Sequence, residues 1–163
     1  MEFPEWAPVY AEICADLGID PSTDETAVRL LEAVTMFLDL DDEDCIIPLI
    51  GDTVTVFGAA RRLENDILAH PPEGTLIAAG SACGRMMDAG FLPDILVTDL
   101  DGDIGPQIRA SQEGAVTLIL AHGDNTDLVR TYAPMFKGKV VLTTQNRPRG
   151  NVLCFGGFTD GDR

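Results

Sequence analysis

The stretch PDILVTDLDGD, residues 93–103, joins a short apolar run to three carboxylates at alternate positions. The apolar run at 95–97 is typical of a strand that is buried on both faces, as in a parallel sheet. Asp99, Asp101 and Asp103 follow directly, where such a strand opens into a loop. Because folding does not require this crowding of like charges, the stretch predicts a buried strand with a ligand site at its carboxyl end.

The same rhythm of apolar runs and polar clusters continues from residue 50 onward. We expect strands at 53–57, 75–79, 94–98, 115–121, 139–143 and 152–155, with helices near 61–69, 82–89, 104–112 and 126–132. Regular alternation of strand and helix predicts a parallel sheet flanked by helices on both faces. The expected fold is therefore a three-layer, Rossmann-like α/β domain over residues 49–163.

Residues 1–48 are expected to form a helical segment ahead of this domain. A helix near residues 9–17 would end at Gly18, which suits a C-terminal cap. Ser22 and Glu25 have the spacing of a capping box at the start of a second helix. Apolar residues then recur at helical intervals, at Val28, Leu31, Val34 and Leu38. The acidic residues at 39–44 are expected to form a solvated loop.

Composition restricts the classes of function. The chain has 163 residues with 11 basic and 27 acidic side chains, a net charge of −16. This charge argues against direct binding to nucleic acid, whereas a phosphate ligand carried by a divalent cation remains compatible. No apolar run approaches the roughly 18 residues of a membrane span, and no leader-like segment opens the chain, so we expect a cytoplasmic protein without a membrane partner. The four cysteines form no CxxC pair, which indicates reduced thiols rather than a zinc or redox site.

Small and polar clusters follow each expected strand, at 58–62, 79–81, 99–103, 122–125, 143–146 and 156–162. In an open parallel sheet the carboxyl ends of the strands lie at one edge, and ligands bind there at a reversal of strand order. Six such clusters predict a ligand pocket at that edge.

The carboxylates of DLDGD suit a magnesium site. Mg²⁺ takes oxygen ligands and usually keeps substrate phosphates as well, so Asp99 and Asp101 are interpreted as its ligands. For Asp103, a metal ligand and the N-terminal cap of the following helix are equally compatible. An EF-hand is excluded because its sixth and twelfth positions would hold Ile104 and Ala110.

A phosphatase of the haloacid dehalogenase type is a weaker alternative for the same stretch. Its nucleophile motif is DxDGT or DxDGV after an apolar strand, whereas this chain has Asp103 at the last position. That chemistry also needs a lysine downstream of a Thr or Ser, and no lysine follows Thr144.

Two further clusters contain candidate ligand contacts. Gly58 precedes Arg61 and Arg62 in a strand–glycine–helix pattern that resembles a phosphate loop. A single glycine matches neither GxGxxG nor GxxxxGK(S/T), so the arginines are either surface charges or phosphate contacts. His122 has no partnering Ser or Cys motif for a triad. Asp124 or Asn125 is suited to cap the next helix.

The chain closes with GGFTDGDR, residues 156–163. The two glycines permit close backbone approach, and Thr159, Asp160 and Asp162 look like the start of a helix, whose free N–H groups attract anions. Because the sequence stops at Arg163, we expect a domain truncated at its C-terminus.

Taken in order, PDILVTDLDGD, AHGDN, TTQ and GGFTDGDR resemble the archaeal 6-hydroxymethyl-7,8-dihydropterin pyrophosphokinase family, which is related in fold to thiamin pyrophosphokinase. The resemblance covers about residues 50–163 and is specific, because four motifs fall in the same order with similar spacing. It implies transfer of pyrophosphate from ATP to a reduced pterin with release of AMP, for folate or methanopterin synthesis. Mg²⁺ is the implied cofactor. The oligomeric state stays open, with a homodimer as one candidate.

With this reaction, Asp99 and Asp101 are the expected catalytic pair and, with Asp103, the metal ligands. The residues expected to contact ATP or the pterin are Gly58, Arg61, Arg62, Ser81, His122, Asp124, Asn125, Thr144, Gln145, Gly157, Thr159, Asp160 and Asp162. The chain departs from the family at 58–63, which reads GAARRL in place of GAGPSL, and at 79–82, which reads AGSA in place of an ADGA-like turn. A metal-dependent glycosyltransferase-like protein and a non-catalytic nucleotide-binding domain remain as alternatives.

Overall fold

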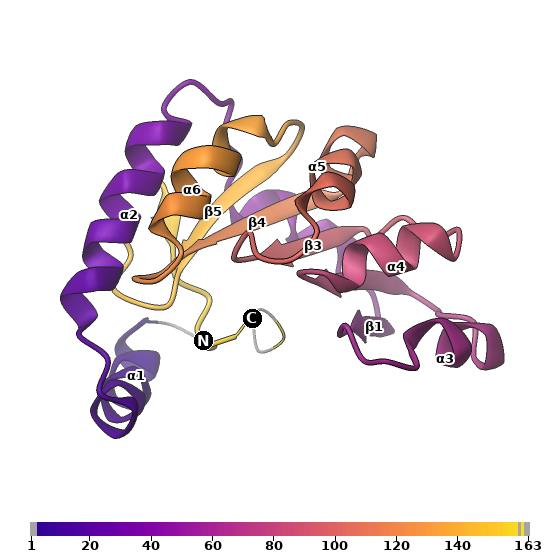
Figure 1. Ribbon diagram of the computed structural model, residues 1–163, viewed down its shortest axis with the longest axis horizontal. Helices are drawn as coiled ribbons and strands as arrows, with labels where there is room; N and C mark the ends of the chain where they lie inside the picture. The colour runs from indigo at the N-terminus through magenta and orange to yellow at the C-terminus, as the bar shows by residue number, and fades with distance from the viewer. Residues whose placement is uncertain (1–2, 160, 162–163) are drawn as a thin grey trace.

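The protein, described by a computed structural model over residues 3–159 and 161, is built on a six-stranded parallel sheet (Figure 1). The strands are β1 (Val54–Phe57), β2 (Thr75–Ala79), β3 (Ile95–Thr98), β4 (Val116–Ala121), β5 (Val140–Thr144) and β6 (Val152–Leu153). The α-helices are α1 (Phe3–Leu17), α2 (Pro21–Thr35), α3 (Leu63–Ala69), α4 (Ala82–Asp88), α5 (Ile104–Glu113) and α6 (Thr126–Tyr132). Three short 3₁₀ helices complete the fold: η1 (Glu43–Cys45), η2 (Ile47–Leu49) and η3 (Ala133–Met135). The prediction of an α/β parallel sheet preceded by helices is confirmed.

The strands stand side by side in the order in which they occur along the chain. Consecutive parallel neighbours joined by right-handed crossovers place every connecting helix on the same face of the sheet. Accordingly, buried residues of α2 to α6 share one apolar core with a single face of the sheet. The expectation that the pocket would lie at a reversal of strand order is wrong, since the described strands contain no reversal.

The second face of the sheet is covered by shorter segments. Its core residues come from β3, β4 and β5, and they pack against side chains of η1 and η2 and of the segment after β5. The chain reaches this face after α2, where Leu40 forms a bridge with Val140 and the Asp41 N–H donates to the carbonyl of Val140. The third layer is therefore made of 3₁₀ helices rather than α-helices, and the acidic stretch at 39–44 is partly tied to β5.

The start of α2 differs from the prediction. Its N-terminal cap is Asp20, whose side chain accepts a hydrogen bond from the Ser22 N–H at 2.9 Å, and Pro21 occupies the first helical position. Proline fixes the backbone for that position and needs no hydrogen-bond partner there, so the helix is capped at Asp20, two residues before the cap predicted at Ser22. The cap of α1 at Gly18 is confirmed by its left-handed φ of 67°.

Strands β3, β4 and β5 are buried at every residue, as the run at 95–97 predicts. Strand β1 lies at the edge of the sheet and is covered on one face only: Val54 and Val56 are exposed, whereas Phe57 is buried. Over the described part of the chain, no helix is long and apolar enough to cross a membrane. The loops that follow β3, β4 and β5 therefore stand on the most completely buried strands of the sheet.

Candidate active site

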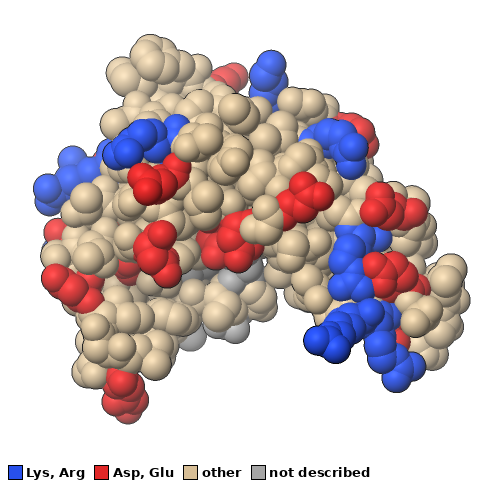
Figure 2. Space-filling view, in the orientation of Figure 1, with Lys and Arg blue, Asp and Glu red and all other residues tan. Residues whose placement is uncertain are grey.

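A cavity of about 700 Å³ opens at the carboxyl ends of β3, β4 and β5. Its opposite wall comes from the junction between α1 and α2 and from the segment near the C-terminus. The lining residues are Leu17, Ile19, Asp20, Thr23, Asp24, Asp99, Asp101, Leu120, His122, Gly123, Asp124, Gln145, Phe158, Thr159 and Gly161. Five of these are carboxylates and none is Lys or Arg. Figure 2 shows acidic side chains across the middle of this face, with basic side chains gathered beside α3.

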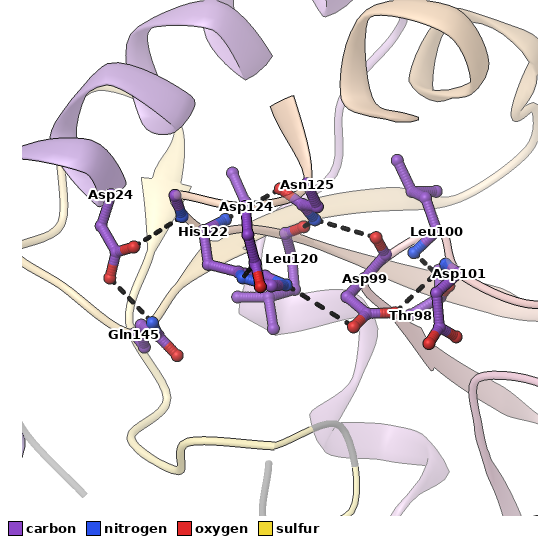
Figure 3. A network of polar contacts seen from close by, with 12 residues as sticks. Asp24, Thr98, Asp99, Leu100, Asp101, Leu120, His122, Asp124, Asn125 and Gln145 are labelled. Carbon is purple, nitrogen blue, oxygen red and sulfur yellow. Dashed lines mark hydrogen bonds and ion pairs between the residues drawn. The ribbon is translucent and has the colours of Figure 1, made fainter. Parts of the chain in front are cut away.

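The loop after β3 brings Asp99 and Asp101 to the cavity (Figure 3). The Asp101 N–H donates to Asp99 Oδ1 at 3.2 Å, so the two carboxylates belong to one tight turn. Leu100 between them has a φ of 70° and is fully buried, while Gly102 has a φ of 68°. These left-handed positions turn the apolar side chain inward and leave both neighbouring carboxylates facing the cavity.

The two carboxylates have opposite electrostatic surroundings. A hydrogen bond with His122 lowers the pKa of Asp99 although burial opposes the shift. Burial, and then the charge of Asp99, raise the pKa of Asp101. Two partly buried carboxylates that repel each other in this way form a natural place for a cation.

His122 connects the loop after β4 to this pair. Its Nε2 lies 3.5 Å from Asp99 Oδ2, and its Nδ1 is paired with Asp124. Burial alone would lower the pKa of His122, but the hydrogen bond with Asp99 and the negative charges of Asp124 and Asp99 outweigh it and raise the pKa. His122 is thus the one basic side chain among the described residues that line the cavity.

Asn125 braces the two loops against each other. Its Nδ2 donates to the carbonyls of Asp99 and Leu120, both at 2.8 Å, and its Oδ1 accepts from the His122 N–H at 3.0 Å. The side chain is almost fully buried, so its amide hydrogens are both used within the protein. Asn125 occupies the cap position of α6 without making a side-chain cap bond, which means that the predicted capping role is wrong.

Asp24 in α2 is a central residue of the site that the sequence did not reveal. Its buried carboxylate accepts hydrogen bonds from the Tyr10 hydroxyl at 2.5 Å, the Gln145 amide at 2.8 Å and the Gly123 N–H at 2.6 Å. Burial raises the pKa of the Tyr10 hydroxyl, and its hydrogen bond to Asp24 raises it further. The Trp6 indole N–H also donates to the Gln145 carbonyl at 2.7 Å, so α1, α2, β4 and β5 meet at one point.

No local pattern marks Asp24, because its partners in the loops after β4 and β5 lie 99 and 121 residues away. Gly123 gives the only hint, since a glycine after a strand allows close approach of another segment. A Cβ at Gly123 would lie 2.1 Å from Thr23 Oγ1, which shows how closely α2 approaches the loop after β4.

The structure places the remaining predicted residues differently. Asp103 caps α5 by accepting from the Gly105 N–H at 3.3 Å and is absent from the cavity lining, so the cap interpretation is confirmed. Gln145 and Thr159 line the cavity, while Thr144 is buried beneath it and donates to the carbonyl of Ala121. Asp160 and Asp162 lie outside the described residues.

The residues predicted after β1 and β2 lie beyond the cavity lining, toward the other end of the same sheet edge. They are Gly58, Arg61, Arg62 and Ser81; Gly157 is likewise absent from the lining. Arg85 of α4 fixes the loop after β1, since it is paired with Glu64 and donates to the carbonyls of Ala60 and Arg61. Ser81 packs against Gly102, where an added Cβ would lie 3.0 Å from the Ser81 Cβ.

The donor set fits a magnesium ion that also binds substrate. Among residues 3–159 and 161, no cluster of three or more His, Cys, Asp or Glu side chains could hold a metal by itself. Asp99 and Asp101 nevertheless offer two oxygen ligands, and Mg²⁺ is commonly held by one or two carboxylates while phosphates and waters complete its coordination.

Three archaeal proteins that share one name align with the whole chain. The 6-hydroxymethyl-7,8-dihydropterin pyrophosphokinase of Methanothermobacter thermautotrophicus is 37% identical over 170 residues, which make up 71% of that protein. Its counterparts in Pyrococcus furiosus and Methanocaldococcus jannaschii are 37% and 31% identical and are covered over 70% and 72% of their lengths. The chain belongs to the 6-hydroxymethyl-7,8-dihydropterin pyrophosphokinase family. The family resemblance predicted from the four motifs is thereby confirmed, although no family model matches the chain.

Proposed function

We propose that this protein transfers pyrophosphate from ATP to 6-hydroxymethyl-7,8-dihydropterin and releases AMP. The observation that carries the proposal is the identity of 31–37%, over the whole of this chain and 70–72% of each relative, to three pyrophosphokinases with this substrate in their names. In this reaction the hydroxymethyl oxygen forms a bond to the β-phosphorus of ATP. The bond from the β-phosphorus to the oxygen that bridges it to the α-phosphorus breaks, the hydroxyl proton is lost, and AMP leaves.

Asp99 and Asp101 are proposed to hold Mg²⁺ in this reaction. A bound Mg²⁺ would neutralise phosphate charge and orient the reacting groups. The cavity lining supports the need for such an ion, because its described residues include five carboxylates and no Lys or Arg, a set that would otherwise repel a triphosphate. Asp103, which caps α5, is the weaker candidate for a third ligand.

The two substrates are proposed to occupy different ends of the sheet edge. The walls near α1 and α2 combine apolar side chains with carboxylates, which suits a flat heterocycle whose amide and amine groups donate hydrogen bonds. These walls include Leu17, Ile19, Leu120, Phe158, Asp20 and Asp124. Arg61 and Arg62 lie in the loop after β1, and we propose that they contact the ATP phosphates.

Asp99, His122 and Asp124 would then border the point where the substrates meet. His122 has one ring nitrogen toward each carboxylate, so its orientation is fixed from both sides (Figure 3). Positioning and charge neutralisation supply most of the acceleration in phosphoryl transfer. A pre-arranged set of side chains at this point is what such a reaction requires.

The test is to incubate the protein with ATP, Mg²⁺ and 6-hydroxymethyl-7,8-dihydropterin and to resolve the nucleotides by chromatography. We expect AMP in equal amount to the pterin diphosphate, and none when the pterin is left out. ADP and phosphate in place of AMP would overturn the proposal in favour of ordinary phosphoryl transfer. ATP binding without any turnover would do so in favour of a non-catalytic nucleotide-binding protein.

A further inference from the structure

Gln107 in α5 is a fully buried amide whose hydrogen bonds all go to the segment at 98–103. Its Oε1 accepts from the Thr98 hydroxyl at 2.5 Å. Its Nε2 donates to the carbonyls of Asp101 at 2.8 Å and of Asp103 at 3.3 Å. A buried amide is costly unless it is satisfied, and this one is satisfied only by the turn that carries the paired carboxylates.

The same turn contains the one left-handed residue other than glycine in the described chain. Leu100 has a φ of 70°, a conformation that an L-residue with a branched side chain rarely adopts. Its N–H donates to Thr98 Oγ1 at 2.8 Å, and that same hydroxyl donates to Gln107. Unfavourable backbone geometry persists only where the surroundings determine it, and here they consist of Thr98, Gln107 and the buried site of the Leu100 side chain.

We infer that Gln107 is a positioning residue, which holds the turn after β3 so that Asp99 and Asp101 face one metal ion. Its side chain is absent from the cavity lining, so it acts through the backbone of the turn and touches neither substrate nor metal. An amide is suited to this task because it donates to two carbonyls and accepts from a hydroxyl at the same time. A carboxylate at this position could not make the two bonds to carbonyl oxygens, because its own oxygens only accept hydrogen bonds.

The inference rests on the proposed function only through the metal ion. Two variants test it: Gln107→Met, which keeps the length of the side chain but makes no hydrogen bond, and Gln107→Glu, which keeps the acceptor for Thr98 but loses the donors. The matched control is Ser111→Ala, which removes a buried polar group from the same helix without touching the turn. Binding of Mn²⁺ is followed by electron paramagnetic resonance of the free ion, with and without α,β-methylene-ATP.

We expect Mn²⁺ affinity to fall about 10- to 100-fold in both Gln107 variants, as found for residues that orient metal ligands, and to stay within about twofold in Ser111→Ala. We also expect kcat to recover as Mg²⁺ is raised, with the KM for the pterin nearly unchanged, a pattern that a general loss of stability does not produce. Folded Gln107 variants that bind Mn²⁺ like the wild type would overturn the inference, as would an equal loss in Ser111→Ala. If Gln107→Met does not fold, Gln107→Glu decides the outcome alone.

The outcomes also separate this inference from the proposed reaction. A wild-type protein that binds Mn²⁺ and loses it in the Gln107 variants, but forms no AMP, would overturn the reaction and leave the role of Gln107 standing. A wild-type protein that binds no Mn²⁺ under either condition would overturn the role of Gln107.

Discussion

The loops after β3 and after β1 have similar kinds of sequence but different surroundings in the fold. Each follows a short strand and contains small and charged residues. Strand β3 lies inside the sheet and is buried throughout, and its loop is bonded to the loop after β4 and to α5. Strand β1 lies at the edge, and Arg61 and Arg62 in its loop are exposed.

The difference shows that polar residues at the end of a strand line a pocket only where other segments form its opposite wall. Strands β4 and β5 have α1 and α2 beside their carboxyl ends, joined through Asp24. The described segments provide no such wall beyond β1, so its loop can assist a bound ligand but encloses none. Four predictions, from the largest expected effect to the smallest, test this contrast.

The largest effect is expected for Asp101→Asn in the loop after β3. Loss of a metal-binding charge should lower kcat about 1000-fold, because the charge that neutralises the reacting phosphates would no longer be held in place. Thermal unfolding should shift Tm by no more than about 3 °C, since the raised pKa of Asp101 shows that its charge is unfavourable in the folded protein. Asp94→Asn at the opposite edge of the same sheet is the control and should keep full activity. Unfolding of Asp101→Asn, or unchanged turnover, would contradict the metal role.

The second effect concerns the wall opposite that loop. Asp24→Ala would leave the Tyr10 hydroxyl, the Gln145 amide and the Gly123 N–H without their acceptor, at a cost of about 3 kcal/mol in the free energy of unfolding. Urea denaturation measures this cost. Glu25→Ala, next to it on the exposed side of α2, should cost less than about 1 kcal/mol. Similar values for the two variants would show that Asp24 does not join the helices to the sheet.

A smaller effect is expected for the loop after β1. Replacing both Arg61 and Arg62 with Ala should raise the KM for ATP about fivefold to tenfold and leave the KM for the pterin unchanged, because exposed charges contribute modestly and are screened by salt. Steady-state kinetics at low and high salt measure this, with Arg130→Ala on α6 as the control. An equal rise in both KM values would contradict the separation of the two substrates along the edge.

The smallest effect is the pH dependence that the Arg85–Glu64 ion pair, next to the loop after β1, gives to the stability of the protein. A hydrogen bond with Arg85 lowers the pKa of Glu64 to about 2. A lowered carboxyl pKa stabilises the folded state above the ordinary value near 4.5, and this contribution is lost as the pH falls toward 2. Urea unfolding across this range should therefore show a steeper loss of stability for the wild type than for Glu64→Gln. Parallel curves would mean that the pair has no measurable effect on stability.

The sequence predicted the elements of the fold because their signals are local. The run at 95–97 and the cap at Gly18 identify a buried strand and a helix end within a few residues, and both are found where expected. The order of the strands depends on pairings between distant segments, and no local signal distinguishes a sequential sheet from one with a reversal.

Only the part of the site that has a local sequence signal could be predicted. Asp99, Asp101 and His122 stand out as ionisable residues directly after strands, and the structure brings them together. Asp24 and Gln107 did not stand out, because a polar residue inside a helix reads as a surface position until tertiary packing buries it.

The most direct test of the account is a crystal structure of the protein with Mg²⁺, α,β-methylene-ATP and 6-hydroxymethylpterin. We predict a metal ion about 2.1 Å from an oxygen of Asp99 and of Asp101, with the triphosphate extending toward the loop after β1 and the pterin toward α1 and α2. A metal ion bound elsewhere, with Asp99 and Asp101 free of both metal and phosphate, would contradict the central claim that the loop after β3 carries the chemistry.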